Sequence, residues 1–235
     1  MSAWDPQWFE AAGATAVRRA LAWRGVEAQH VVSTLRLVDH PDEQALLEQL
    51  LEGSKPALPA AAQGLHYLLA TPFRYAPPHA SRFRVAHAKG QWYGAESLFA
   101  ACAEVAYWRQ RFVSDSEGLR ERELLTEHSF FQGLIDGPSI DLSAPPWQQA
   151  HEAWTQDSDY SATHALATAA QARGVQWLRY ESVRAPGHFC AVALVPQCLR
   201  EPPGGLDGTR QTWHCKATRR RVMLTRGRER WVWDF

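Results

Sequence analysis

The stretch Ser81–Glu104, SRFRVAHAKGQWYGAESLFAACAE, organises the rest of the chain and carries its most varied chemistry. Residues 81–85 alternate arginine with apolar side chains, which is typical of a strand with one buried face. Residues 86–90 predict a turn that ends at a glycine, which can adopt a positive φ. Residues 91–94 predict a second strand, and from Ser97 the apolar residues recur at helical spacing. The stretch therefore predicts a hairpin that leads into a helix.

Glu104 lies at the margin of the apolar stripe of this expected helix. A carboxylate there is partly desolvated, so it needs an ion pair, hydrogen bonds or a function. Two interpretations are open. Glu104 pairs with Arg109 or Arg111 on the helix surface, or it belongs to a functional site with Arg82 and Tyr93. The structural alternative for the arginines of residues 81–85 is an edge strand that charge protects from aggregation.

Four short motifs follow one another along the chain. They are Arg82-Phe83, Gly90 with Tyr93, Glu104 eleven positions after that tyrosine, and Tyr180-Glu181-Ser182 before Gly187. Their order resembles the core of the RES domain family, the toxins of bacterial RES-Xre toxin–antitoxin pairs. Three upstream segments are similar to one branch of that family: Leu35–Asp39, Glu43–Leu51 and His66–Tyr75. The similarity runs from about Val32 to Pro196.

The resemblance implies an α+β fold like that of NAD-consuming ADP-ribosyltransferases, with a mixed or antiparallel β core flanked by helices. The chain has 235 residues and no shift in composition, so a single domain is expected. We expect residues 1–30 to form an amino-terminal helical extension. Residues 31–235 would then form the RES-like catalytic unit.

The resemblance also implies NAD as substrate, cleaved between nicotinamide and ribose. That bond breaks through an oxocarbenium-like transition state, whose positive charge Glu104 would stabilise. An arginine suits the pyrophosphate because its planar fork bonds two oxygens; Arg82 matches the family position and Arg84 is the local alternative. Tyr93 would flank the nicotinamide ring, and Ser182 would hydrogen-bond the nicotinamide or its ribose.

Two positions differ from the frequent family pattern, because Arg84 and His188 stand where asparagine is common. Both put more potential positive charge near an anionic ligand. The acceptor of ADP-ribose stays open. Water would make the protein an NAD glycohydrolase, inorganic phosphate an NAD phosphorylase, and a protein side chain an ADP-ribosyltransferase.

Other classes of enzyme and of site find less support. The chain has no Gly-x-Gly-x-x-Gly turn for a Rossmann dehydrogenase, and Ser182 lacks the Gly-x-Ser-x-Gly elbow of a hydrolase. The four cysteines show no metal-ligand spacing, so neither a disulfide nor a metal site is expected. The alternative from another class is a catalytically inactive relative that binds an Xre-type antitoxin or a nucleotide.

The balance of charge bears on partners. A formal net charge of zero favours neither nucleic acid nor an anionic membrane. No window is long and apolar enough to span a bilayer and the first residues lack a signal-peptide pattern, so a cytoplasmic protein is expected. A toxin that drains NAD implies an Xre-like antitoxin that covers its pocket. The eleven tryptophans leave room for a homo-oligomer with an apolar interface.

The other segments predict packing elements. Helices are expected from Asp5 towards Trp23, over 42–51 with its leucines inward, over 114–128 and over 159–172. Strands are expected over 30–37, 175–180 and 188–195, and within 211–235 around a turn at Arg226-Gly227-Arg228. Asp136-Gly137-Pro138 predicts a loop, and Arg219-Arg220-Arg221 a charged edge strand.

Overall fold

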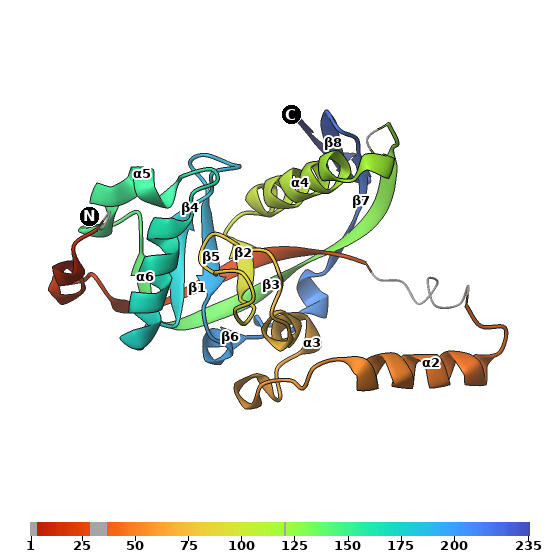
Figure 1. The fold of residues 1–235 in the computed structure, drawn as a ribbon, viewed down its shortest axis with the longest axis horizontal. Helices are drawn as coiled ribbons and strands as arrows, with labels where there is room; N and C mark the ends of the chain where they lie inside the picture. Colours follow the sequence, from red (N-terminus) through yellow and green to blue (C-terminus); the bar gives the residue numbers. More distant parts are fainter. Residues whose placement is uncertain (1–3, 29–36, 120) are drawn as a thin grey trace.

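The computed structural model describes residues 4–28, 37–119 and 121–235. In this part of the chain nine strands form one sheet, and the main helices lie against or beside it (Figure 1). The strands are β1 (Ala16–Glu27), β2 (Trp92–Ala95), β3 (Leu124–Asp141), β4 (Trp177–Glu181), β5 (Phe189–Ala193), β6 (Leu199–Arg200), β7 (Gln211–Ala217), β8 (Arg221–Arg226) and β9 (Glu229–Asp234). The helices are α2 (Pro41–Ser54), α3 (Tyr67–Ala70), α4 (Leu98–Asp115), α5 (His151–Trp154) and α6 (Ser161–Ala172). The α+β class is confirmed.

The sheet closes on itself at one end. Strand β1 pairs with β2, β2 with β5, β5 with β4, β4 with β3, and β3 again with β1. Only the β3–β4 pair among these is parallel, so the predicted mixed core is present. Beyond this ring, β3 continues into an antiparallel extension through β7, β8 and β9. The ring and its extension both border α4, which lies across them in Figure 1.

The long strand β3 corrects two expectations. Its side chains alternate between buried and half-buried positions along most of its length, as a strand requires. The helix expected over 114–128 is therefore wrong for its second half, where β3 pairs with β7. The loop expected at Asp136-Gly137-Pro138 is wrong as well, because these residues pair with β1 and the Pro138 carbonyl accepts from Gln176 N–H at 2.8 Å.

The amino-terminal helix from Asp5 to Trp23 is also wrong. Only Pro6–Glu10 is helical, as a single 3-10 turn capped by Asp5. Gly13 adopts a φ of +77°, which no α-helix accommodates, and β1 follows it. Residues 16–27 pair with β3 along the whole strand. In place of the helical extension expected over residues 1–30, the described residues 16–27 contribute a strand of the ring.

Several other elements match their expectations. Helix α6 and strands β4 and β5 lie within a few residues of the predicted bounds. Strands β7, β8 and β9 follow, with Gly227 at a φ of +58° in the turn between β8 and β9. The strand expected over 30–37 lies almost wholly outside the described residues. The edge strand expected at Arg219-Arg220-Arg221 is wrong, because only Arg221 is in a strand and that strand, β8, lies between β7 and β9. Arg221 forms an ion pair with Asp234 of the edge strand β9 at 2.5 Å.

Small side chains let α4 approach the sheet closely. Its buried face is made almost entirely of alanine and cysteine: Ala100, Ala101, Cys102, Ala103, Ala106 and, near its end, Val113. Ser97 caps the helix, since its hydroxyl accepts from Ala100 N–H at 3.2 Å. The predicted start of the helix is therefore confirmed. This close packing brings the second turn of α4, with Glu104, to the sheet.

Aromatic residues fix the amino-terminal turn to the body. Trp4, Trp8 and Phe9 all contact the ring of Trp147, which is fully buried, at centroid distances between 4.9 and 6.1 Å. The indole N–H of Trp147 also donates to the Ala14 carbonyl at 2.9 Å. Trp4 and Trp147 are therefore core residues, and Trp8 is half-buried against them.

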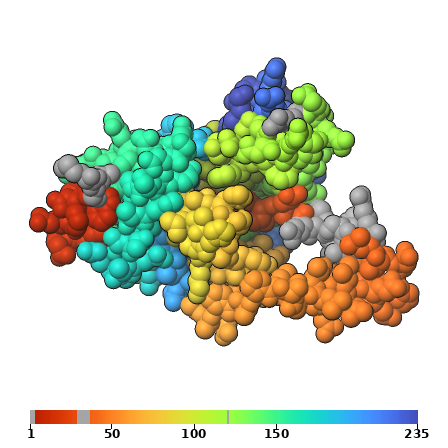
Figure 2. Space-filling model, in the orientation of Figure 1, coloured from red at the N-terminus to blue at the C-terminus, as the bar shows by residue number. Residues whose placement is uncertain are grey.

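Helix α2 is more exposed to solvent than the sequence predicts. Its leucines were expected inward, but Leu46, Leu50 and Leu51 are 56%, 62% and 44% exposed. The helix projects from the body as a separate lobe (Figures 1 and 2). Its cap is His40, whose imidazole accepts from the N–H of Asp42 at 3.3 Å, so Asp42 lies inside the first turn.

Among the described residues, no helix combines the length and apolarity needed to cross a membrane.

Candidate active site

Residues 81–84 form a tight turn, not the predicted strand. Ser81 and Arg84 exchange backbone hydrogen bonds of 2.9 and 3.0 Å across it. Helix α6 holds this turn, because the Thr163 hydroxyl bonds the Arg82 carbonyl and the His164 imidazole lies 2.8 Å from the Ser81 carbonyl. The turn points Arg82 and Arg84 into different surroundings.

Arg84 is almost fully buried, with 7% of its surface exposed. Its guanidinium donates to the carbonyls of His79, Pro77, Val85 and Ala88, at distances from 2.6 to 3.3 Å. Every one of these acceptors belongs to the loop around it. Arg84 therefore holds the loop of residues 77–88 together through these hydrogen bonds.

The glycine at position 90 is required by close packing and not by a positive φ. A Cβ there would lie 1.8 Å from the Pro72 carbonyl oxygen, inside any contact distance. The positive φ of this loop, 61°, falls on His87 instead. The expectation of a left-handed Gly90 is therefore wrong, although the need for glycine is real.

Arg82 extends towards the carboxyl end of α5. One guanidinium nitrogen donates to the carbonyls of Trp154 at 2.8 Å and Gln156 at 2.9 Å, and the group lies 5.1 Å from the centre of the Tyr160 ring. No acidic side chain of the described chain forms an ion pair with it. Its charge is thus held in place by neutral groups.

Tyr93, on β2, is anchored by its hydroxyl. That hydroxyl donates to Gln91 Oε1 at 2.9 Å, accepts from Phe83 N–H at 3.2 Å and lies 2.9 Å from the Ser81 hydroxyl. Burial raises the pKa of Tyr93 to about 12, so the phenol stays protonated at neutral pH. The hydroxyl serves structure, and the ring is left to line the cavity.

Glu104 is held by a serine. The Ser182 hydroxyl donates to Glu104 Oε1 at 2.8 Å, and the same hydroxyl oxygen accepts from Arg184 N–H at 3.2 Å and Ala185 N–H at 3.1 Å. Ser182 is 1% exposed, so its hydroxyl is committed to these partners. Within the described chain, Glu104 Oε2 has no hydrogen-bond partner.

Burial governs the acidity of Glu104. Desolvation raises the pKa of this carboxyl, while the Ser182 hydrogen bond and the charges of Arg184 and Arg82 oppose the rise. The surface-pairing alternative does not apply. Arg109 pairs with Glu27, and Arg111 lies 3.2 Å from Asp115.

A cavity of about 520 Å³ brings these side chains together. Arg82, Tyr93 and Glu104 line it, whereas Ser182 touches Glu104 from outside the lining and Arg84 borders a separate, smaller cavity. The other charged and aromatic lining residues are Trp23, Arg24, Glu27, Tyr107, Trp108, Arg109, Phe112, His128, Tyr160, Tyr180 and Arg184. The site is a partly apolar cleft with basic groups and one buried acid.

Arg24 is the lining residue that sequence reasoning missed. It lies on β1 and donates to the Tyr93 carbonyl at 2.8 Å, while its buried Nε has no partner among the described residues. Burial lowers the pKa of Arg24 to about 10, which leaves it charged at neutral pH. Like Arg82, it forms no ion pair with an acid of the described chain. The cavity thus holds two cations without acidic partners.

Arg184 closes one side of the cavity. It pairs with Asp157 at 2.8 Å and lies 3.6 Å from the centre of the Tyr107 ring on α4. This contact joins the loop after Ser182 to the helix that carries Glu104. No cluster of three or more potential metal ligands occurs in residues 4–28, 37–119 and 121–235.

Comparison with known protein families and solved structures identifies the family of this chain. The model of the family described as "RES domain" matches residues 57–216, more than half of the chain. The chain belongs to the RES domain family. No curated protein matches the chain. Among solved structures, the chain is similar to one from the MbcT–MbcA toxin–antitoxin complex of M. tuberculosis, with 16% identity, 87% of each chain covered and a TM-score of 0.47.

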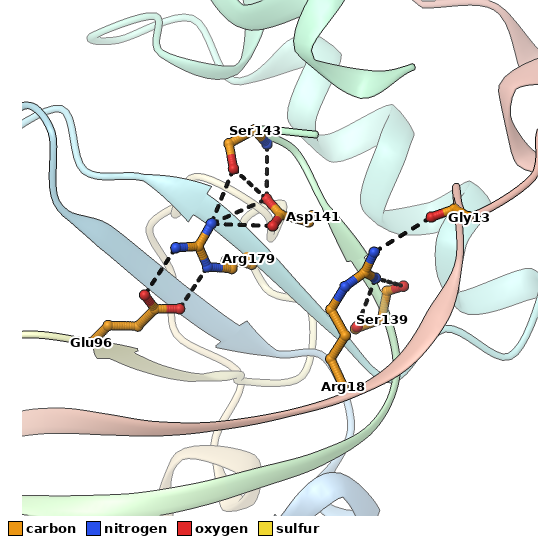
Figure 3. A network of polar contacts seen from close by, with 7 residues as sticks. All are labelled: Gly13, Arg18, Glu96, Ser139, Asp141, Ser143 and Arg179. Atoms are coloured by element: carbon orange, nitrogen blue, oxygen red, sulfur yellow. Dashed lines mark hydrogen bonds and ion pairs between the residues drawn. The ribbon is translucent and has the colours of Figure 1, made fainter. Parts of the chain in front are cut away.

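An ion-pair network connects strands beside this cavity (Figure 3). Arg179, on β4, forms two hydrogen bonds with Glu96, of 2.6 and 3.0 Å, and one of 3.1 Å with Asp141 Oδ2. Glu96 directly precedes the cap of α4, and Arg179 lies three residues before Ser182. The network therefore ties the start of the Glu104 helix to the strand that leads to Ser182.

Proposed function

We propose that this RES-family protein is the toxin of a toxin–antitoxin pair and that it cleaves NAD between nicotinamide and ribose. The observation that carries the proposal is the environment of Glu104. A half-buried carboxylate, fixed by a serine and with one oxygen free, borders a cavity that also holds two arginines without acidic partners in the described chain. An anionic ligand with a glycosidic bond fits both features.

Glu104 would act on the ribose. As the bond to nicotinamide breaks, positive charge develops on the sugar, and a carboxylate already in place stabilises it without reorganisation. The Ser182 hydroxyl would act through Glu104, by fixing Oε1 and leaving Oε2 for the ribose. Removal of one such preorganised group typically lowers the rate about a hundredfold to a thousandfold.

Arg82 and Arg24 would bind the pyrophosphate. Both are held by backbone carbonyls, which orient a guanidinium without neutralising it. A doubly charged pyrophosphate would supply the missing negative charge. Arg84 is less suited to this role, because its donors are already occupied by four carbonyls.

Aromatic side chains would hold the rings of the substrate. Tyr93 lines the cavity together with the two arginines and Glu104, and its ring would flank the nicotinamide. Trp23, Trp108 and Phe112 line the same cavity from β1 and α4 and offer faces for stacking of a base. Trp108 and Phe112 are more than half exposed, so an antitoxin that covers the cavity mouth would also bury them.

The test is product analysis after incubation of NAD with the purified chain, with and without inorganic phosphate. Nicotinamide with ADP-ribose indicates hydrolysis, and nicotinamide with a phosphorylated ADP-ribose indicates phosphorolysis. If the NAD carries a label on its ADP-ribose part, transfer of that label to an added protein indicates ADP-ribosylation. If calorimetry detects NAD binding without nicotinamide release under any of these conditions, the chain is the inactive binding module instead.

A further inference from the structure

Helix α2 carries an apolar surface that the described part of the chain leaves uncovered. Leu46 and Leu50 lie one turn apart, and Leu51 extends the same side; all three are 44–62% exposed. Figure 1 shows α2 away from the sheet, joined to the body through its carboxyl end. There Glu52 pairs with Arg74 at 2.7 Å. A leucine-rich helix face of this kind marks a contact surface.

The charge of α2 is one-sided. Residues 41–54 contain Asp42, Glu43, Glu48 and Glu52 and no lysine or arginine. All four acids are exposed. A partner for this helix should therefore combine an apolar surface with positive charge.

The extension of the sheet presents such a surface. On the face opposite α4, a row of direct cross-strand neighbours runs Leu125, Lys216, Met223, Val232. Leu125 is 73% exposed and Val232 is 47% exposed. A shallow groove of about 460 Å³ is lined by three members of this row, Leu125, Lys216 and Met223, and by Glu127 beside them. An uncovered sheet face with a row of apolar side chains is a packing surface for a helix.

The rim of this face is basic. Residues 218–235 contain six arginines and two acids. Arg221 pairs with Asp234 and Arg226 with Glu229. The remaining four, Arg219, Arg220, Arg228 and Arg230, are exposed and form no ion pair with an acid of the described chain. Glu123 pairs with Lys216 on this face and Glu127 lines the groove, so the positive charge that complements α2 is that of the arginine rim. The two surfaces are both apolar, and the acids of α2 are complementary to this rim.

We propose that two copies of the chain associate, with α2 of each copy seated on the outer face of the β3–β7–β8–β9 sheet of the other. Helix α2 and the β7–β8 strands lie on the same side of the molecule in Figure 1. A two-fold axis on that side brings each helix to the opposite sheet, so both contacts form at once. Neither surface includes Glu104, Arg82 or Arg24, so the cavity stays open in the dimer.

Sedimentation equilibrium of the full chain measures the association. The expected mass is twice the 26.5 kDa of one copy, and the dissociation constant is expected to rise with salt because exposed charges contribute. Leu50→Lys puts a cation on the helix, and Val232→Asp puts an acid on the sheet. Each variant alone is expected to weaken association about tenfold or more, because it sets like charges together.

Mixing the two variants is the decisive step. A mixed dimer has one native contact and one contact in which the new lysine faces the new aspartate, so association is expected to recover. Val17→Lys is the matched control: Val17 is 74% exposed on β1, outside both surfaces, and its variant should associate like the parent. Circular dichroism checks that all variants fold.

A monomer at every concentration tested would overturn the proposal, even if the same surfaces bind another protein. So would a dimer that both single variants leave intact, or variants that fail to restore each other on mixing.

Discussion

The hydroxyl of Ser182 donates to Glu104 Oε1 at 2.8 Å and joins two residues that are 78 positions apart. Glu104 is presented by α4, and Ser182 by the turn after β4. Among the described residues, Ser182 makes the short hydrogen bond to this carboxylate, and the Cys190 thiol lies farther away, at 4.0 Å from the same oxygen. Burial raises the pKa of Glu104, and this hydroxyl is the nearest described group that opposes the rise.

Glu104→Gln is expected to stabilise the fold at neutral pH. Burial raises the pKa of Glu104, so the ionised form is disfavoured in the folded state relative to the unfolded state. Its favourable contribution is complete below the unfolded pKa and is lost as pH rises through the folded pKa. The amide keeps an acceptor for Ser182 and removes the charge.

The measurement is the melting temperature of parent and variant across pH 4–8. The gain from Glu104→Gln should be largest at pH 7–8 and shrink towards pH 4. An equal shift at all pH values would show that charge burial is not the cause. Glu152→Gln, at an exposed position on α5, is the matched control and should leave the melting temperature nearly unchanged.

Ser182→Ala is expected to move the pH dependence of nicotinamide release. The Ser182 hydrogen bond lowers the Glu104 pKa, so its loss should raise that pKa further and shift the acidic limb of the rate profile to higher pH. The rate at the optimum should also fall. A merely structural serine would lower the rate without moving the limb. Ser143→Ala, a serine of the Arg179 network, serves as control.

Arg24→Gln and Arg82→Gln are expected to raise the KM for NAD more than they lower kcat. A hydrogen bond to a charged group contributes about 1.5–3 kcal/mol, roughly a 10- to 150-fold change. Steady-state kinetics on each variant provides the test. An unchanged KM for NAD in both variants would contradict the proposal that Arg24 and Arg82 bind the pyrophosphate.

Arg84→Met is expected to act on stability instead. It leaves four loop carbonyls without their donor, and one unsatisfied buried group already costs about 1–3 kcal/mol. Denaturant unfolding should show this loss. A folded Arg84→Met variant of full stability with a strongly raised KM would instead make Arg84 the pyrophosphate ligand.

Tyr93→Phe separates the ring from its hydroxyl. The hydroxyl anchors residues 81–83 and 91 by three contacts, so its loss should lower the free energy of unfolding by about 1–3 kcal/mol. The ring remains, and NAD affinity measured by calorimetry should change little. Tyr93→Ala should weaken binding strongly; equal affinity of both variants would exclude a stacking role.

Local patterns were sufficient to predict the helix that carries Glu104. Its apolar spacing and the Ser97 cap are both properties of a short segment, and the structure confirms them. Helix α6 and strands β4 and β5 are of the same kind. Together these patterns placed Glu104 on a helix and Ser182 in the turn just after a strand.

Long-range pairing explains what the sequence did not reveal. Residues 16–27 contain alanine, arginine and leucine, which favour a helix, but they pair with β3 more than a hundred residues later. Arg24 was hidden by that expectation. Gly13 and Gly25 were the available sequence signals, because glycine is unfavourable inside a helix. The structure shows why position 25 needs glycine: a Cβ there would lie 2.5 Å from the Phe130 ring.

Arg82 and Arg84 occupy different environments, and long-range contacts again explain why the sequence did not reveal this. Both arginines fit an alternating strand, and only the contacts of the folded chain distinguish them. The turn of residues 81–84 sends Arg82 to the cavity and encloses Arg84 among carbonyls. Such a difference depends on residues 77–88 and 154–156 together, which no local pattern encodes.

The most direct measurement is the rate of nicotinamide release from NAD by the parent chain and by Glu104→Gln, both shown to be folded. We expect release by the parent, and a rate at least about a hundredfold lower in the variant. Equal rates in the two proteins, or no release by the folded parent with water, phosphate and protein acceptors present, would contradict the assignment of Glu104 as the catalytic carboxylate of an NAD-cleaving toxin.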